Sequence, residues 1–154
     1  MATVNKIYIA ADRKDPVVPI KEAFLERDKG IVGDRYYFNA EKALSEGKVP
    51  PDNQVTLIAS EVLDDFLGKH DADLHYGDFR RSIVTSGIDL NALVGKEFTV
   101  GEARCKGVEL CEPCAWLAKN VHQAVLPELL HKTGIRAVVL ASGKIKPGSE
   151  ISPA

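Results

Sequence analysis

Gly107-Val-Glu-Leu-Cys-Glu-Pro-Cys-Ala-Trp-Leu117 is the stretch around which the sequence is organised, because it joins a strand pattern to a helix pattern. It carries two of the chain's three cysteines. Pro113 fixes one backbone angle between them and moves Glu112 out of the helical region, so we expect the helix to begin at or after Pro113. Cys114 then lies in the first helical turn, where free N–H groups and partial positive charge favour thiolate over thiol. Cys114 is therefore the candidate catalytic residue.

The two cysteines of this stretch are compatible with several kinds of site. Their Cys-x-x-Cys spacing occurs in redox-active pairs, but these usually lie in a thioredoxin-like βαβ unit, which this sequence lacks. With Cys105 and His122 they supply the ligand types of a structural zinc site, although Cys105 falls in a predicted strand and His122 in a predicted helix. A third interpretation is one reactive thiolate, Cys114, with Cys111 beside it. A fourth is a pair of buried packing residues, and the spacing alone does not separate it from the third.

Length, charge and hydropathy limit the class of protein. The 154 residues fit a single domain, 1–154. A chain of this length buries about 70% of its unfolded surface and needs no disulfides. Its 20 basic and 22 acidic residues leave no basic field for nucleic acid. No apolar run is long enough to span a membrane, and the N-terminus leads into a strand pattern without a signal-peptide stretch. We therefore expect a cytoplasmic protein whose reduced cysteines serve chemistry or packing.

Most segments outside this stretch have short strand patterns. We expect strands over residues 4–10, 79–85, 97–100, 104–110 and 135–140, and a closing hairpin over 143–151. The clearest helix pattern covers 56–68, with an apolar stripe that begins at Ile58 and faces the core. Further helices are expected over 115–125 and from Pro127 to Gly134, whereas residues 39–54 have the composition of a loop. Many short strands with a few helices predict an α+β, mainly β, barrel-like domain.

Three arginines are candidates for binding an anion. Arg35 follows Gly33-Asp34, and Arg80 and Arg81 are adjacent. Guanidinium groups bind phosphate or carboxylate through paired hydrogen bonds, and glycines allow such a ligand to approach the backbone. Because neighbouring side chains on a strand face opposite ways, at most one of Arg80 and Arg81 faces a given pocket. Taken singly, each is better explained as an ordinary surface or ion-paired arginine.

Four segments become informative when they are considered in order: residues 30–36, 80–98, 107–117 and 135–140. The first is Gly-Ile-Val-Gly-Asp-Arg-Tyr, the second begins Arg-Arg-Ser-Ile-Val-Thr-Ser-Gly-Ile-Asp-Leu, and the third contains Cys-Glu-Pro-Cys. Together they resemble the MOSC domain, which occurs at the C-terminus of molybdenum cofactor sulfurases and in small stand-alone bacterial proteins. The resemblance runs from about residue 4 to residue 151. It implies a mainly β fold similar to the barrel domain of pyruvate kinase.

The resemblance also implies a ligand and a set of site residues. MOSC proteins bind the molybdopterin form of molybdenum cofactor. Their key cysteine corresponds to Cys114, which would ligate molybdenum or carry sulfur as a persulfide. The basic positions would hold the pterin phosphate, and Ser82 stands where the family often has asparagine. The positions expected to contact the cofactor are Asp34, Arg35, Arg80, Arg81 and Ser82.

Three functional hypotheses remain. In the first, Cys114 ligates molybdenum and electrons pass to an N-hydroxylated substrate, as the resemblance to reductases implies. In the second, a Cys114 persulfide delivers sulfur to metal–sulfur centres or to the cofactor, without turnover of its own. In the third, the protein is a structural β domain whose cysteines pack or bind zinc. The sequence has no segment for the N-terminal barrel of larger reductases or for a pyridoxal-phosphate desulfurase domain. We therefore expect a sulfur donor or electron-transfer proteins as partners, and a monomer or homodimer.

Overall fold

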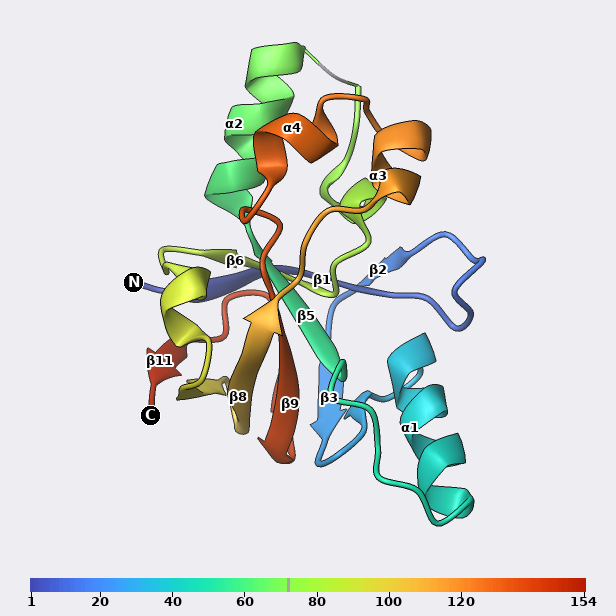
Figure 1. Cartoon of the computed structure of the whole chain (residues 1–154). Helices are drawn as coiled ribbons and strands as arrows, with labels where there is room; N and C mark the ends of the chain where they lie inside the picture. The colour runs from blue at the N-terminus through green and yellow to red at the C-terminus, as the bar shows by residue number, and fades with distance from the viewer. Residues whose placement is uncertain (72) are drawn as a thin grey trace.

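The structure is a computed structural model that describes residues 1–71 and 73–154. It is mainly β with a few short helices, as the sequence predicts (Figure 1). The elements are β1 (Thr3–Ile9), β2 (Val18–Ile20), β3 (Ala23–Glu26), β4 (Gly30–Ile31), α1 (Arg35–Ser45), β5 (Val55–Ala59), α2 (Ser60–His70), η1 (Tyr76–Phe79), β6 (Ile83–Ser86), η2 (Leu90–Leu93), β7 (Glu97–Val100), β8 (Ala103–Leu110), α3 (Ala115–Asn120), α4 (Val125–Leu129), β9 (Ile135–Ala141), β10 (Gly143–Ile145) and β11 (Ile151–Pro153).

Two sheets form the β part of the molecule. An eight-stranded sheet has the order β11-β7-β8-β9-β5-β6-β1-β2, and a three-stranded sheet has the order β10-β3-β4. Neighbouring strands are antiparallel except β5 and β6, which run parallel. Parallel neighbours need a crossover connection, and α2 supplies it here. The pairing of β8 with β9 places Leu110 opposite Ile135, so the chain that leaves β8 emerges beside the chain that enters β9.

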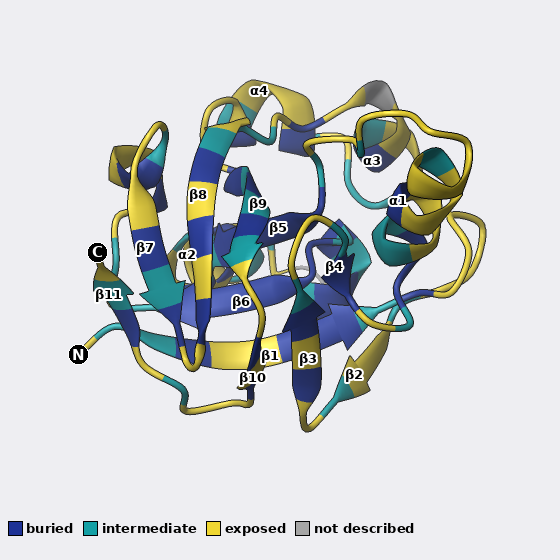
Figure 2. Cartoon of the chain, turned by 90° about the horizontal axis from the view of Figure 1, so that it is seen from below, coloured by how far each residue is buried: buried dark blue, intermediate teal, exposed yellow. Residues whose placement is uncertain are grey.

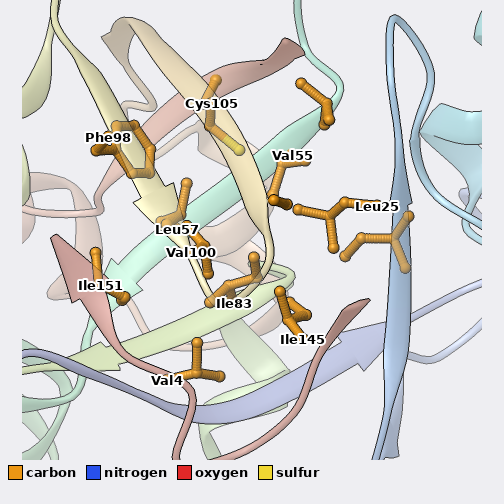
Figure 3. Packing of buried hydrophobic residues seen from close by; sticks show 14 of the residues in the cluster. Val4, Leu25, Val55, Leu57, Ile83, Phe98, Val100, Cys105, Ile145 and Ile151 are labelled. Atoms are coloured by element: carbon orange, nitrogen blue, oxygen red, sulfur yellow. The ribbon is translucent and has the colours of Figure 1, made fainter. Parts of the chain in front are cut away.

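Alternating burial along the strands creates the larger core cluster. In β8 buried and exposed residues alternate over most of its length, as Figure 2 shows, which is the pattern of a strand with one face on the core. Cys105 belongs to the buried set and packs near Phe98, Leu57 and Val55 (Figure 3). The alternation of β8 therefore directs Cys105 into the core.

A second cluster lies under the helices at one end of the sheet. Figure 1 shows α2, α3 and α4 gathered there, whereas α1 lies apart, near β3. The buried residues that join these helices to the sheet are Tyr8, Ile58, Leu63, Phe66, Phe79, Val84, Leu117, Val125 and Leu129. This packing fixes α3, and with it the Cys-Glu-Pro-Cys segment, against the end of the sheet.

Several element boundaries differ from the prediction. Ile58 lies in buried strand β5, and the helix begins only at Ser60, because a strand buried on both faces has a continuous apolar run that periodicity cannot separate from a helix. The expected loop over 39–54 contains most of α1, of which only Arg35 and Ala40 are buried. Residues 143–151 do not form one hairpin: β10 pairs with β3, and β11 pairs with β7.

The barrel expectation is not confirmed. The strand pairings of the described residues, 1–71 and 73–154, leave the larger sheet open, with β11 at one edge and β2 at the other. An isolated bridge between Thr3 and Glu150 brings the start of β1 beside the chain that enters β11. The likeness to the pyruvate kinase barrel thus stays a prediction. Within the same described residues, no helix has the length and apolar character needed to cross a membrane.

We expect Gly134→Ala to destabilise the protein much more than Gly47→Ala. Both glycines have positive φ, +87° and +73°, so alanine at either position adds a left-handed backbone cost of about 1–2 kcal/mol. A β-carbon at position 134 would also overlap the carbonyl oxygen of Leu57, whereas position 47 has no atom within 4 Å. In urea denaturation, the free energy of unfolding should fall by ~2 kcal/mol more for Gly134→Ala. Equal losses would show that close packing against Leu57 does not constrain position 134.

Candidate functional site

The backbone of Cys111 is held from both sides where β8 ends. Its N–H donates to the carbonyl of Gly134 over 2.8 Å. Its carbonyl accepts hydrogen bonds from the hydroxyl of Thr133 and from Nη2 of Arg81 at 3.2 Å. These contacts all come from the β9 entry and from the residue pair before β6, so tertiary structure fixes the start of the Cys-Glu-Pro-Cys segment. The Cys111 side chain is half-buried.

Cys114 caps α3 and is exposed. Its backbone is extended, with φ −122° and ψ 170°, so the helix begins one residue later than a first-turn position for Cys114 requires. Pro113, which precedes Cys114, is buried, so this part of the segment packs on the rest of the protein. Because α3 has only six residues, its dipole contributes little to the thiol.

Arg81 lies inside the protein and uses its guanidinium to organise the cysteine segment. Nε donates to the carbonyl of Thr133 at 3.0 Å, and Nη1 donates to the carbonyl of Phe79 at 3.3 Å. Nη2 donates to the carbonyls of Cys111 and Glu112, at 3.2 and 3.4 Å. A buried guanidinium with this many main-chain acceptors is a structural group first, because a phosphate would have to replace bonds already made.

Arg80 faces the opposite way from Arg81. It has a left-handed backbone, with φ 60°, and it precedes β6 rather than lying in it. Its guanidinium donates to the carbonyls of Asp15 and Arg13, at 2.8 and 2.9 Å, and lies over the ring of Trp116 at 5.8 Å. Partial burial, and then the positive charge of Arg35, lower the pKa of Arg80. Binding an anion beside Arg80 would relieve this repulsion.

Arg35 and Asp34 form a buried pair at the start of α1. One carboxylate oxygen of Asp34 accepts from the N–H of Ala10 at 3.0 Å and from Nη1 of Arg35 at 3.1 Å. Among the described residues, the other oxygen has no hydrogen-bond partner. Burial raises the pKa of Asp34, opposed by the N–H of Ala10 and the charge of Arg35. Nη2 of Arg35 donates to the carbonyl of Arg80 at 3.4 Å, so the two arginines are connected.

Ser82 is directed into the protein interior. Its N–H donates to the hydroxyl of Thr56 at 2.9 Å, and its own hydroxyl accepts from the same group at 3.3 Å. Only 2% of Ser82 is exposed. The structure therefore brings Arg35, Arg80 and the cysteine segment together, while Ser82 joins the β5 region to the entry of β6.

A cleft of about 980 Å³ opens beside Arg80. One part of its wall is aromatic and apolar, and another part is basic. Trp116, which is half exposed, lines this wall and follows Cys114 by two residues, so the Cα atoms of the two residues are at most about 7 Å apart. The hydrogen bond from Tyr76 to Asp64 raises the pKa of Tyr76 to about 12, which keeps this phenol neutral. The basic and aromatic residues of the wall include Lys14, Tyr8, Tyr76, Arg80 and Trp116.

The zinc interpretation of the cysteines is wrong. Cys105 is only 1% exposed and lies in the core, away from the surface that Cys114 reaches. Nδ1 of His122 accepts from the N–H of Ala124 at 3.1 Å, and its ring packs edge-to-face on Phe66. Over residues 1–71 and 73–154, no three His, Cys, Asp or Glu side chains are placed to hold a metal ion.

Sequence reasoning missed the aromatic wall and the role of Thr133. Tyr8 and Tyr76 lie in segments far from Cys114 in sequence, and each reads as an ordinary core residue. Trp116 had a usable signal, because it is the chain's only tryptophan and lies two residues after Cys114. Thr133 had no signal in the sequence, since its importance comes from bonds to residues that the fold brings near.

Comparison with known proteins identifies related sequences and folds. The sequence profile of the MOSC domain matches residues 44–152. This range includes Arg80, Arg81, Ser82 and Cys114, whereas Asp34 and Arg35 precede it. No curated protein matches the sequence.

Solved structures with the same fold come from several bacteria. The YUAD protein from Bacillus subtilis is 17% identical with a TM-score of 0.77, covering 98% of this chain and 94% of its own. YiiM from Geobacillus stearothermophilus is 15% identical with a TM-score of 0.73, covering 100% of this chain and 75% of its own. YiiM from Escherichia coli is 17% identical with a TM-score of 0.68, and the match covers 100% of this chain and 70% of the YiiM chain. At these identities the similarity establishes a common fold.

The adjacent arginines should differ sharply in their effect on stability. Arg81→Ala leaves several buried carbonyls without their charged donor, so the free energy of unfolding should fall by about 3–5 kcal/mol. Arg80→Ala removes a partly exposed group and should cost about 1 kcal/mol. Urea denaturation of the two variants measures the difference. Similar losses for both would contradict the structural role assigned to Arg81.

The three thiols should react with iodoacetamide in the order of their accessibility. Cys114 is exposed and should be alkylated first. Burial raises the pKa of Cys111, and burial raises the pKa of Cys105 to about 12, so their thiolate fractions at neutral pH are small. Peptide mass spectrometry of timed samples gives each rate, and Cys105 should stay unmodified until the protein unfolds. Early labelling of Cys105 in folded protein would contradict its assignment to the core.

Proposed function

Since this chain belongs to the MOSC domain family, we propose that it binds molybdenum cofactor and that Cys114 is its protein ligand to molybdenum. The family is known in molybdenum-cofactor-related proteins. The observation that carries the proposal is an exposed thiol, Cys114, two residues before Trp116, which lines a cleft whose wall is both cationic and aromatic. Thiolate is a soft ligand of the kind that binds transition metals.

The charged part of the site suits the phosphate end of the cofactor. Arg80 and Arg35 are two linked cations, and within residues 1–71 and 73–154 the carboxylate that forms an ion pair with either of them is Asp34, which pairs with Arg35. A phosphate beside Arg80 would supply the missing negative charge, and Lys14 lies on the same wall. Arg81 would act indirectly, because its bonds to Cys111 and Glu112 set the course of the cysteine segment.

The apolar part of the site suits a flat ring system. Trp116, Tyr8 and Tyr76 offer aromatic surface, and the cleft volume of about 980 Å³ is at the upper end of the usual range for small-molecule sites. The neutral phenol of Tyr76 can also hydrogen-bond to a ligand. When bound, the molybdenum centre supplies two-electron reduction, the chemistry required to remove oxygen from an N-hydroxylated compound. The chain's own residues would bind the cofactor and set the direction from which a substrate approaches. Electrons would come from separate transfer proteins.

A second candidate function is transfer of sulfur. Cys114 would hold a persulfide received from a donor protein and deliver it to metal–sulfur centres or to the cofactor. The observation that favours this function is the second thiol, Cys111, three residues away and half-buried. A persulfide carrier needs an exposed thiol to meet its donor, which Cys114 provides.

Cofactor retention should depend on Cys114 and Arg80. After expression in cells that make the cofactor, we expect purified wild-type protein to contain molybdenum and pterin. Cys114→Ser should retain at least roughly tenfold less molybdenum, because the soft ligand is lost. Arg80→Ala should retain less pterin, because the anion-binding cation is lost. Elemental analysis and the fluorescence of oxidised pterin measure both.

Two matched controls accompany these variants. Cys111→Ser keeps the main-chain bonds of that residue and should retain cofactor. Arg104→Ala removes a cation that pairs with Glu97 at a distant position on β8, and it should also retain cofactor. Loss from all four variants would indicate general destabilisation, and full retention by Cys114→Ser would refute metal ligation. Cyanide-labile sulfur on metal-free protein would favour the second function.

A further inference from the structure

We propose that Cys111 is a resolving thiol that discharges sulfur from Cys114 as sulfide, an inference that rests on the persulfide form of the proposed function. The basis is the contrast between the two thiols of one short segment. Cys114 is exposed and open to a donor, whereas Cys111 is half-buried, three residues away and held in place. Two intervening residues are the spacing of known dithiol pairs that exchange disulfides.

Hydrogen bonds on both sides of Cys111 hold the backbone that carries this thiol. Its N–H and carbonyl bond to Gly134, Thr133 and Arg81, so the segment cannot swing away when Cys114 is modified. The next carbonyl, from Glu112, is held by the same Nη2 atom of Arg81. One guanidinium therefore holds two successive carbonyls of the segment that joins the two cysteines.

The surroundings of the Cys111 thiol act on its pKa in opposite directions. Burial raises the pKa of Cys111 above its ordinary value; Arg81 is the cation that opposes this shift, while Cys114 and Glu112 add to it. When Cys114 carries a persulfide, the negative charge resides on the outer sulfur, one bond beyond Sγ. Glu112 itself is engaged elsewhere: its carboxylate accepts from the N–H of His131 at 2.7 Å.

The reaction conserves atoms and electrons without an added oxidant. The Cys111 thiolate attacks Sγ of Cys114, a Cys111–Cys114 disulfide bond forms, and the bond from that Sγ to the outer sulfur breaks. The outer sulfur leaves with the electron pair as hydrosulfide and takes up a proton according to pH. The carried sulfur is thereby reduced, and the two cysteines are oxidised by two electrons in total. A dithiol reductant then returns both cysteines to thiols.

The consequence for function is a limit on how long sulfur stays on the carrier. With an acceptor present, the outer sulfur is handed on and both cysteines remain reduced. Without one, Cys111 removes the sulfur and leaves an oxidised segment that cannot be reloaded until it is reduced. Cys111 would thus control the fate of the sulfur rather than its loading.

The test uses full-length, metal-free, reduced protein loaded with inorganic polysulfide and then desalted. Intact mass detects one added sulfur atom, a colorimetric assay measures released sulfide, and peptide mapping locates persulfide and disulfide. Wild-type protein should release sulfide while the Cys111–Cys114 disulfide appears. Cys111→Ser should load sulfur on Cys114 but release sulfide at least about tenfold more slowly, because the internal nucleophile is missing.

Other variants separate the possible failures. Cys111→Ala repeats the test without a hydroxyl, and its circular dichroism establishes folding. Cys105→Ser should behave as wild type, since Cys105 lies in the core. If wild-type protein takes up no sulfur on Cys114, the sulfur-carrier function fails and this inference fails with it. If sulfur loads but Cys111→Ser and wild type release sulfide equally, or if persulfide moves to Cys111, only the resolving role is overturned.

Discussion

The buried guanidinium of Arg81 is the interaction on which the rest of the site depends. It connects segments that are distant in sequence, with carbonyl partners 31 and 52 residues away at Glu112 and Thr133. A buried charge is stable only when its donors are hydrogen-bonded, so the carbonyls must converge on it. The entry of β6, the end of β8 and the entry of β9 are therefore held together at the point where the cysteine segment leaves the sheet.

Because of that arrangement, the adjacent residues Arg80 and Arg81 have different roles. The guanidinium of Arg81 is fully engaged in hydrogen bonds to main-chain carbonyls. Arg80 has a left-handed backbone, faces outward and lines the cleft. Arg35 lies behind Arg80 and adds positive charge. The cysteines are divided in the same way, because Cys105 packs, Cys111 is anchored and Cys114 is exposed. Chemically identical side chains, the two arginines and the three cysteines, thus acquire different properties from burial.

Local pattern predicted the elements that have one face on the core and failed where that condition does not hold. Strands β8 and β9 alternate, and their predicted positions are close to those observed. Strand β5 is buried throughout most of its length, so its apolar run merged with the stripe of α2. Helix α1 buries little, so its composition resembles a loop. Periodicity reports burial on one side, and it is uninformative when both sides or neither are buried.

The sequence by itself determined that a Cys-Glu-Pro-Cys segment follows a half-buried strand and precedes a helix, and that a few arginines accompany it in a MOSC-like order. Those features depend on neighbours in the chain. Only the tertiary structure decided that Arg81 points inward and Arg80 outward, that Ser82 bonds to Thr56, and that aromatic residues from distant segments share one cleft. The physical reason is that hydrogen bonds from a buried side chain to remote carbonyls leave no periodic trace in the sequence.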